Sequence, residues 1–209
     1  MKKFFYILIA LFFTDMSLHA GGKVSAGIAA GYQYDTGRLG ERNGINADVQ
    51  QNLSMGAAFK FDMSFLFFRS GVEYSYPIEK GKVSDGSAGA LTETSLSFYE
   101  VPVFGGLNIT LRDYGSFSIG GGGAYIFGTG SVRTTSGNTG INEQLFGWGF
   151  LAGVESEIYS GASLFMELEY VAARTSPVAS VSGTYDDFYA DYSGHRFRFG
   201  VLYHFNRYQ

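Results

Sequence analysis

The 209-residue chain contains no cysteine. This excludes disulfide bonds, thiolate metal sites, cysteine nucleophiles and the lipid-bearing cysteine of a lipoprotein. Charged residues make up only 16% of the chain, against roughly 25% in average soluble proteins. A helical membrane protein is also excluded, because no run of about 18 apolar residues follows the first twenty positions. The net charge of −4 argues against a nucleic-acid partner, since nucleic-acid-binding surfaces are basic.

The N-terminus has the pattern of a cleaved signal peptide. Lys2 and Lys3 precede a ten-residue apolar core, residues 4–13, which is too short to span a bilayer comfortably as a helix. We expect residues 1–20 to be removed after Ala20, leaving residues 21–209 as a single domain with 13 basic and 18 acidic residues. The alternative is an N-terminal anchor helix or a buried strand.

Glycine (30 residues) and aromatic residues (17%) are abundant, and they recur in segments of about ten alternating residues. In residues 23–34, even positions are apolar or aromatic and odd positions are mostly small or polar. Because successive side chains of a strand point to opposite faces, this pattern gives one apolar and one polar face. Eight such segments are predicted, at residues 23–34, 52–61, 65–76, 94–111, 116–130, 145–158, 162–173 and 194–205.

The breaks between these segments alternate between long and short. The short ones predict tight turns at residues 62–64, 112–115 and 159–161, and the long ones predict loops at residues 35–51, 77–93, 131–144 and 174–193. We therefore predict an all-β fold: an eight-stranded antiparallel up-and-down transmembrane β-barrel with short periplasmic turns and four longer extracellular loops. Pro102 falls inside a segment and predicts a bulge or kink there.

The chain resembles the family of small outer-membrane β-barrel proteins of Gram-negative-type bacteria over its whole length. The resemblance rests on the alternating segments, on the stretch Phe98-Tyr99-Glu100-Val101-Pro102 and on the aromatic-ended last segment, residues 197–205. It implies an outer-membrane location, contact with outer-membrane lipid, and recognition by periplasmic chaperones and the barrel insertion machinery. Four residues follow Phe205, whereas family members usually end on the aromatic residue itself.

Charged residues on the polar faces of the segments are the main candidate site. Eight of them point into the predicted lumen: Arg69, Glu73, Glu100, Glu155, Glu167, Glu169, Arg196 and Arg198. Counted from the turn side, Arg69, Glu155, Glu167 and Arg198 form one layer and the other four form the next. An eight-stranded barrel is just wide enough for side chains, so we expect a structural network of ion pairs. A polar track for protons or small solutes and catalysis by a carboxylate pair are the alternatives.

Aromatic residues gather at both ends of the outward faces. The set comprises Tyr32, Tyr34, Tyr74, Tyr76 and Trp148 near the loops, and Tyr203 and Phe205 near the turns. Two such bands are typical of the interfacial girdles of outer-membrane barrels.

Three functions fit these features: a non-enzymatic barrel with a structural or surface-interaction role through its loops, a narrow channel for small or hydrophobic solutes, and an integral enzyme. His195 lies near Ser193, Asp186, Asp187 and Asp191 in the sequence, which suits a hydrolase but is also common in a polar loop. Residues 185–192 combine aromatic and acidic side chains that would suit an extracellular ligand or a divalent cation, or they form an ordinary loop. We expect the first function, with no enzymatic activity, metal or cofactor.

Overall fold

The computed structural model describes residues 22–35, 46–47, 51–78, 81–84, 91–111, 115–134, 137–159, 161–173 and 192–205. The predicted signal peptide, most of the predicted loop 174–193 and the last four residues lie outside these ranges, so the predictions made for them stay predictions. In the described ranges, no helix is long and apolar enough to cross a membrane.

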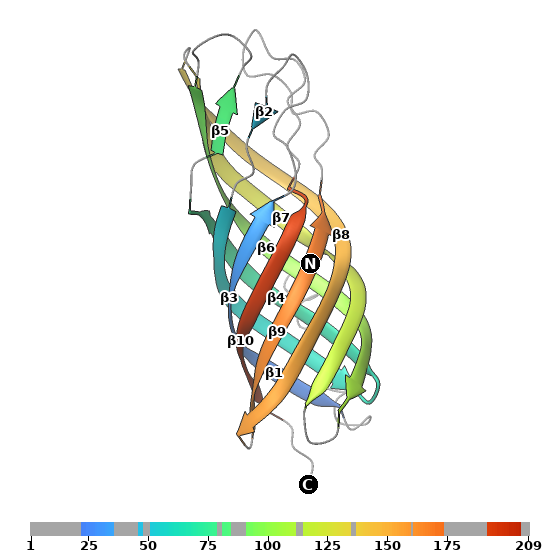
Figure 1. Ribbon diagram of the computed structural model, residues 1–209. Coiled ribbons are helices and arrows are strands. Elements are labelled where there is room, and N and C mark those ends of the chain that lie inside the picture. Colours follow the sequence, from blue (N-terminus) through green and yellow to red (C-terminus); the bar gives the residue numbers. More distant parts are fainter. Residues whose placement is uncertain are drawn as a thin grey trace, which may run out of the picture.

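Eight long strands of the described chain form a closed barrel (Figure 1). They are β1 (Lys23–Asp35), β3 (Gln51–Met63), β4 (Leu66–Pro77), β6 (Leu91–Thr110), β7 (Ser116–Thr134), β8 (Gly137–Tyr159), β9 (Ala162–Ala172) and β10 (Gly194–His204). The strand order is β6-β4-β3-β1-β10-β9-β8-β7, and β7 pairs with β6 to close the ring. All pairings are antiparallel. The predicted fold class is confirmed.

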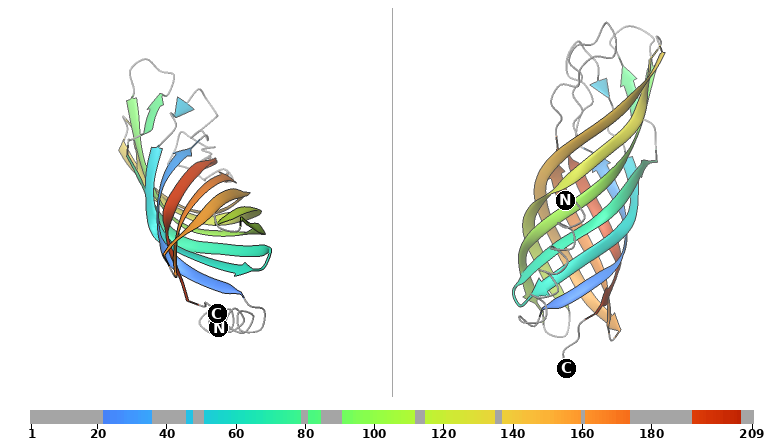
Figure 2. Two further views of the ribbon diagram at one scale, coloured as in Figure 1. Left: turned by 60° about the horizontal axis from the view of Figure 1, so that its bottom comes forward. Right: turned by 180° about the vertical axis from the view of Figure 1, so that it is seen from behind.

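Above one end of the barrel, the sheet continues as an extension (Figures 1 and 2). The β7–β8 ladder runs on to the pair Thr134–Gly137, so the prediction of a loop over residues 131–144 was wrong. Two short strands, β2 (Asn46–Ala47) and β5 (Gly81–Ser84), add to the edge of β6. The sequence did not reveal these pairings because they form between backbone groups, and a segment outside the lipid needs no apolar alternation to make them.

The turns at the other end are tight. The last β3–β4 pair is Met63–Leu66, so the turn falls on Ser64 and Phe65 and not on residues 62–64 as predicted. Ser64 has φ 52°, a left-handed conformation that such a turn requires. Asp62 consequently remains in the strand, and its side chain is buried in the lumen.

Pro102 does not cause the predicted bulge. The β4–β6 ladder keeps one register on both sides of it, from Ser70–Val103 to Glu73–Glu100, and only the pairings between these two points are lost. Proline has no N–H to donate, so the ladder loses bonds without gaining a residue. The register shift in the barrel lies instead in β8, between Glu157 and Tyr159.

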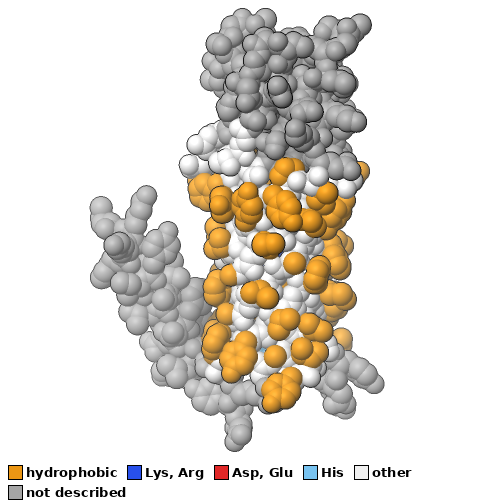
Figure 3. Space-filling view, turned by 90° about the vertical axis from the view of Figure 1, so that its left-hand side faces the viewer, with side chains coloured by type: hydrophobic (Ala, Val, Ile, Leu, Met, Phe, Trp, Pro, Cys, Tyr) orange, Lys and Arg blue, Asp and Glu red, His pale blue; other side chains and the backbone are white. Residues whose placement is uncertain are grey.

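The outer face of the barrel is apolar around its circumference. Large hydrophobic side chains such as Ile28, Leu107, Phe150 and Leu168 are at least half exposed, and they run along the whole barrel wall in the view of Figure 3. A surface of this kind is stable only in contact with lipid, because a contiguous apolar patch of that size is not tolerated in water.

Candidate functional site

Alternation along the strands sends every second side chain into the lumen. The structure buries all eight charged residues that the sequence directed there, with exposed fractions from 0% for Glu169 to 7% for Glu155 and Glu167. An isolated buried charge is costly, so these residues need partners of opposite sign. Their partners divide them into two clusters.

We call the first the central cluster: Arg69, Glu73, Glu100, Glu167, Glu169, Arg196 and Arg198. Two of its ion pairs cross the lumen. Arg69 Nε on β4 lies 2.5 Å from Glu167 Oε1 on β9, and Arg196 on β10 pairs with Glu100 on β6. In each pair, the two strands are separated by three others in either direction around the wall. The ion pairs therefore connect opposite walls and occupy the interior between them.

Arg198 completes the central cluster by binding two carboxylates. Its Nη2 atom lies 2.5 Å from Glu169 Oε2, and its Nη1 atom lies 3.0 Å from Glu73 Oε1. The backbone register places Arg198 opposite Glu167, yet Arg198 Nη1 is 4.0 Å from Glu167 Oε2. The long side chain leans away from its cross-strand neighbour to the diagonal one, which the register alone does not predict.

Glu155 belongs to a second group, the basal cluster, at the turn end of the lumen. Its Oε2 atom lies 2.8 Å from Lys60 Nζ, and its Oε1 atom accepts hydrogen bonds from Lys23 Nζ at 2.9 Å and Ser163 Oγ at 2.8 Å. Glu155 thus pairs with Lys60, the cross-strand neighbour of Arg69, and with none of the three other charged residues of its predicted layer among the contacts described. The strands are tilted, so residues at equal counts from the turns do not lie at equal depth.

The basal cluster also contains residues that the sequence analysis did not single out. Lys60 Nζ is 3.1 Å from Asp62 Oδ1, which also accepts a hydrogen bond from Asn108 Nδ2. Ser25 Oγ and His204 Nδ1 lie 2.7 Å apart. Lys60 could have been identified from the sequence, because it lies on the polar face of its segment. Asp62 was missed because the turn was assigned one residue too early.

Aromatic rings lie beside charged groups of both clusters and form part of the lumen filling. Phe165 lies under Arg69, with its ring centroid 5.6 Å from the guanidinium carbon, and the Phe67 ring centroid is 6.0 Å from Lys60 Nζ. A cavity of about 10 Å³ remains beside these rings and Leu202, which is about the space of one water molecule. The described lumen is thus packed at this level.

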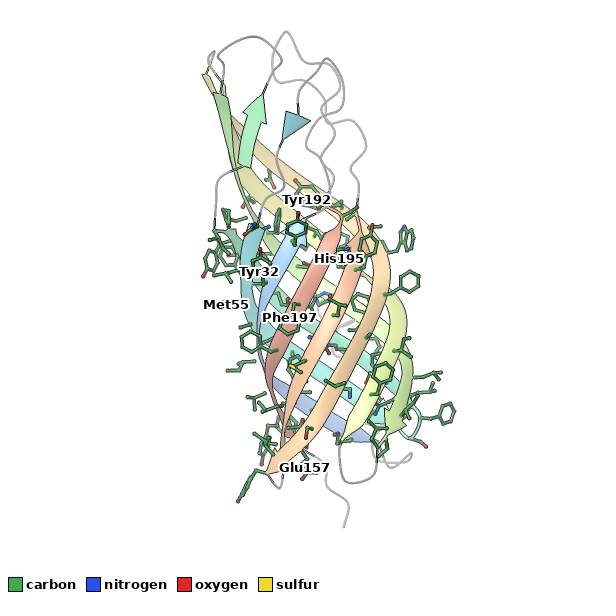
Figure 4. The ribbon with its side chains drawn as sticks, in the orientation of Figure 1. Tyr32, Met55, Glu157, Tyr192, His195 and Phe197 are labelled. Atoms are coloured by element: carbon green, nitrogen blue, oxygen red, sulfur yellow. The ribbon has the colours of Figure 1, made fainter. Side chains whose placement is uncertain are left out.

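Apolar side chains form a buried cluster toward the loop end of the lumen. Phe98 and Tyr192 meet edge to face with ring centroids 5.2 Å apart, and Ile126, Leu145 and Val171 are buried in the same cluster. Tyr192 N donates a hydrogen bond to Ala173 O, which fixes the point where the chain re-enters the barrel. Figure 4 shows Tyr192 at this upper end.

His195 does not face the lumen. It pairs with Tyr34 and Tyr170 on the outer face, is exposed, and has its ring centroid 5.1 Å from that of Tyr170. Figure 4 shows it near the loop end of the barrel. The three aspartates that the sequence associates with it lie outside the described residues. In the described chain, no group of three or more His, Cys, Asp or Glu side chains is arranged to hold a metal ion.

The aromatic residues of the predicted girdle lie on the outer face. Six of them are exposed and Tyr76 is half-buried: Tyr32, Tyr34, Tyr74, Trp148, Tyr203, Phe205 and Tyr76. At the loop end, Tyr74 contacts Tyr99 with ring centroids 4.9 Å apart, and at the turn end, Tyr203 contacts Phe205 at 5.3 Å. Each end therefore presents contacting rings at the level where lipid headgroups are expected.

A closed antiparallel barrel of eight strands with an apolar outer wall and a packed, charged interior defines an outer-membrane β-barrel protein. No protein-family model and no curated protein matches the sequence.

Solved structures nevertheless share the fold. Neisserial surface protein A matches with a TM-score of 0.51 and 14% identity over 88% of this chain and 97% of that chain. A major outer membrane protein from Thermus thermophilus matches with a TM-score of 0.51 and 14% identity over 87% of this chain and 99% of that one. The attachment invasion locus protein Ail of Yersinia pestis gives a TM-score of 0.42 at 15% identity, over 87% and 98% of the two chains. The shared fold rests on the first two structures, and at 14% identity their likeness shows the fold and not the activity.

Proposed function

We propose that this protein is a non-conducting, non-enzymatic outer-membrane barrel that acts at the cell surface through the sheet extension and loops above its lumen. The observation that carries the proposal is the pair of ion bridges across the interior, Arg69–Glu167 and Arg196–Glu100. Each bridge places side chains across the lumen, and the cavity beside Phe67, Phe165 and Leu202 has only about the space of one water molecule.

The rest of the interior supports the same function. The Phe98–Tyr192 contact belongs to a buried apolar cluster toward the loop end, and the ion pairs of the basal cluster lie toward the turn end. Beyond the barrel, β6, β7 and β8 rise as a continuous sheet with β5 and β2 at its edge. A rigid sheet is a better platform for an extracellular ligand than separate loops, because less conformational entropy is lost on binding.

Planar-bilayer recording tests the closed lumen. Purified wild-type protein should give no steady stepwise current at neutral pH. A steady stepwise current from single barrels would refute the sealed interior and favour the function of a narrow channel. The exposed-face variant Leu168→Ala provides a matched control, because it alters the lipid-facing wall and leaves the lumen unchanged.

The surface role needs a second experiment. Replacing residues 131–140 by the two-residue turn Asn-Gly removes the upper β7–β8 hairpin and keeps the ladder from the pair Gly130–Ile141 downward. The variant should still fold, as judged by heat-modifiable migration in unboiled gels, while cells that display it lose adhesion to host-cell matrix or to neighbouring cells. Unchanged adhesion of cells displaying the shortened barrel would contradict a role for the extension.

A further inference from the structure

The central cluster is not electrically balanced. It contains three arginines and four glutamates, all less than a tenth exposed, so its formal charge is −1. With His204 neutral, the basal cluster is balanced, with Lys23 and Lys60 against Asp62 and Glu155. An uncompensated charge in a packed interior carries a large desolvation cost. The excess carboxylate of the central cluster therefore needs a positive charge that the described side chains do not supply.

The contacts locate this excess. Arg69 is engaged by Glu167 and Arg196 by Glu100, which leaves Arg198 shared between Glu73 and Glu169. Each of the four glutamates has one buried oxygen without a hydrogen-bond partner, and guanidinium nitrogens of Arg69 and Arg198 also lack one, so the division of the ion pairs and not the hydrogen bonding locates the excess. The contribution from Arg69 is weak, since its Nη2 and Nη1 atoms lie 4.0 Å from Glu73 Oε1 and Glu169 Oε1.

The walls around this site add no charge among the described side chains. The groups that face it from β4, β6, β9 and β10 are the other members of the central cluster. The inward positions of the remaining strands at this level are neutral: Gly31 and Gln33 on β1, Ser54 and Gly56 on β3, Ile126 on β7 and Leu151 on β8. Among the described side chains, no further cation lies at this level to compensate the excess carboxylate.

We propose that the folded barrel binds one monovalent cation, a proton or an alkali metal ion, between Glu73 and Glu169. A proton needs only one carboxylate oxygen, and the Oε1 atom of either glutamate provides it. The absence of a three-ligand acidic group among the described residues makes the proton the better candidate. Because the cation binds the folded barrel and not the unfolded chain, the unfolding equilibrium depends on the concentration of that cation.

Equilibrium urea unfolding in phosphatidylcholine vesicles tests the proposal. Trp148, the only tryptophan, lies on the lipid-facing wall and reports unfolding by its fluorescence. In one arm, pH is varied at fixed NaCl. In the other, Na⁺ is exchanged for tetramethylammonium at fixed pH and ionic strength. If a proton is bound, the equilibrium constant for unfolding rises by up to about tenfold per pH unit. This rise falls between the pH at which the unfolded chain releases the proton and the higher pH at which the folded barrel releases it. Bound Na⁺ makes that constant fall by up to about tenfold for each tenfold rise in Na⁺.

Two variants assign the effect to the site. Glu73→Gln and Glu169→Gln each remove the excess charge while keeping the shape of the side chain. In each variant, the unfolding constant should lose the part of its dependence on pH or Na⁺ that comes from this site and keep the part that comes from other titrating groups. Glu157→Gln, an exposed site on β8, is the matched control and should keep the part that comes from this site. Equal dependence in the wild type and both cluster variants, or no dependence in the wild type, would overturn the proposal. The wild-type arms give a result even if a variant fails to fold.

Discussion

The ion pair between Arg69 and Glu167 provides the sharpest test of how the lumen is held together. We expect Arg69→Met to destabilise the folded barrel by about 3–5 kcal/mol, the cost of leaving a buried charge without its partner. Both side chains are buried and their atoms are 2.5 Å apart. After the substitution, the closest remaining arginine atom to Glu167 in the central cluster is Arg198 Nη1, at 4.0 Å from Oε2. The formal charge of the cluster also changes from −1 to −2.

A second substitution separates this charge effect from lost packing. The Arg69→Met, Glu167→Met double variant restores the formal charge of −1, and apolar pairs often replace buried ion pairs at little cost. Methionine also keeps contact with the Phe165 ring, so the loss of the cation–π interaction contributes only about 0.5–2 kcal/mol. The double variant should therefore be more stable than Arg69→Met alone.

Urea unfolding in vesicles, followed by Trp148 fluorescence, measures all these differences. The exposed-site variant Thr129→Val on β7 should change the free energy of unfolding by less than about 0.5 kcal/mol. Two results would refute the reasoning. One is a cost below about 1 kcal/mol for Arg69→Met. The other is a double-variant cost equal to the sum of the two single ones, since residues in direct contact should not be additive.

Three further changes test other parts of the barrel by the same unfolding measurement. Leu168→Arg places a charge on the lipid-facing wall and should cost about 2–4 kcal/mol, whereas Tyr203→Arg near the turn end should cost about 0–1 kcal/mol; equal costs would contradict the membrane position. Phe98→Ala removes a buried ring of the apolar cluster toward the loop end and should cost about 3–5 kcal/mol, and a near-neutral result would show that this end is not packed. Gly153→Leu should lower the free energy of unfolding by about 1–3 kcal/mol, because a Cβ atom at this position would lie 3.0 Å from Glu167 Cγ. A neutral outcome would mean that the glutamate can move aside freely.

The sequence predicted the bounds of the strands correctly in the part of the barrel that faces lipid. Residues 23–34 and 162–173 were predicted within one residue of β1 and β9, because a strand exposed to lipid on one face must alternate apolar with polar or small residues. The same rule directed the eight charged residues to the lumen. Above the membrane it no longer applies, and the sequence analysis placed a loop where β7 and β8 continue.

Alternation and strand count by themselves determined that this chain forms a closed eight-stranded barrel and which side chains enter it, because both depend only on local backbone periodicity and on the need to satisfy every backbone group in lipid. The tertiary structure decided which charges meet. Glu155 pairs with Lys60, a residue on a strand that only the closed barrel brings to it, and the length of Arg198 lets it bind Glu169 and Glu73 in place of its cross-strand neighbour. The depth of a residue in the barrel and the direction of its side chain depend on the shear of the whole barrel, that is, on the offset between its strands. No single segment encodes this offset.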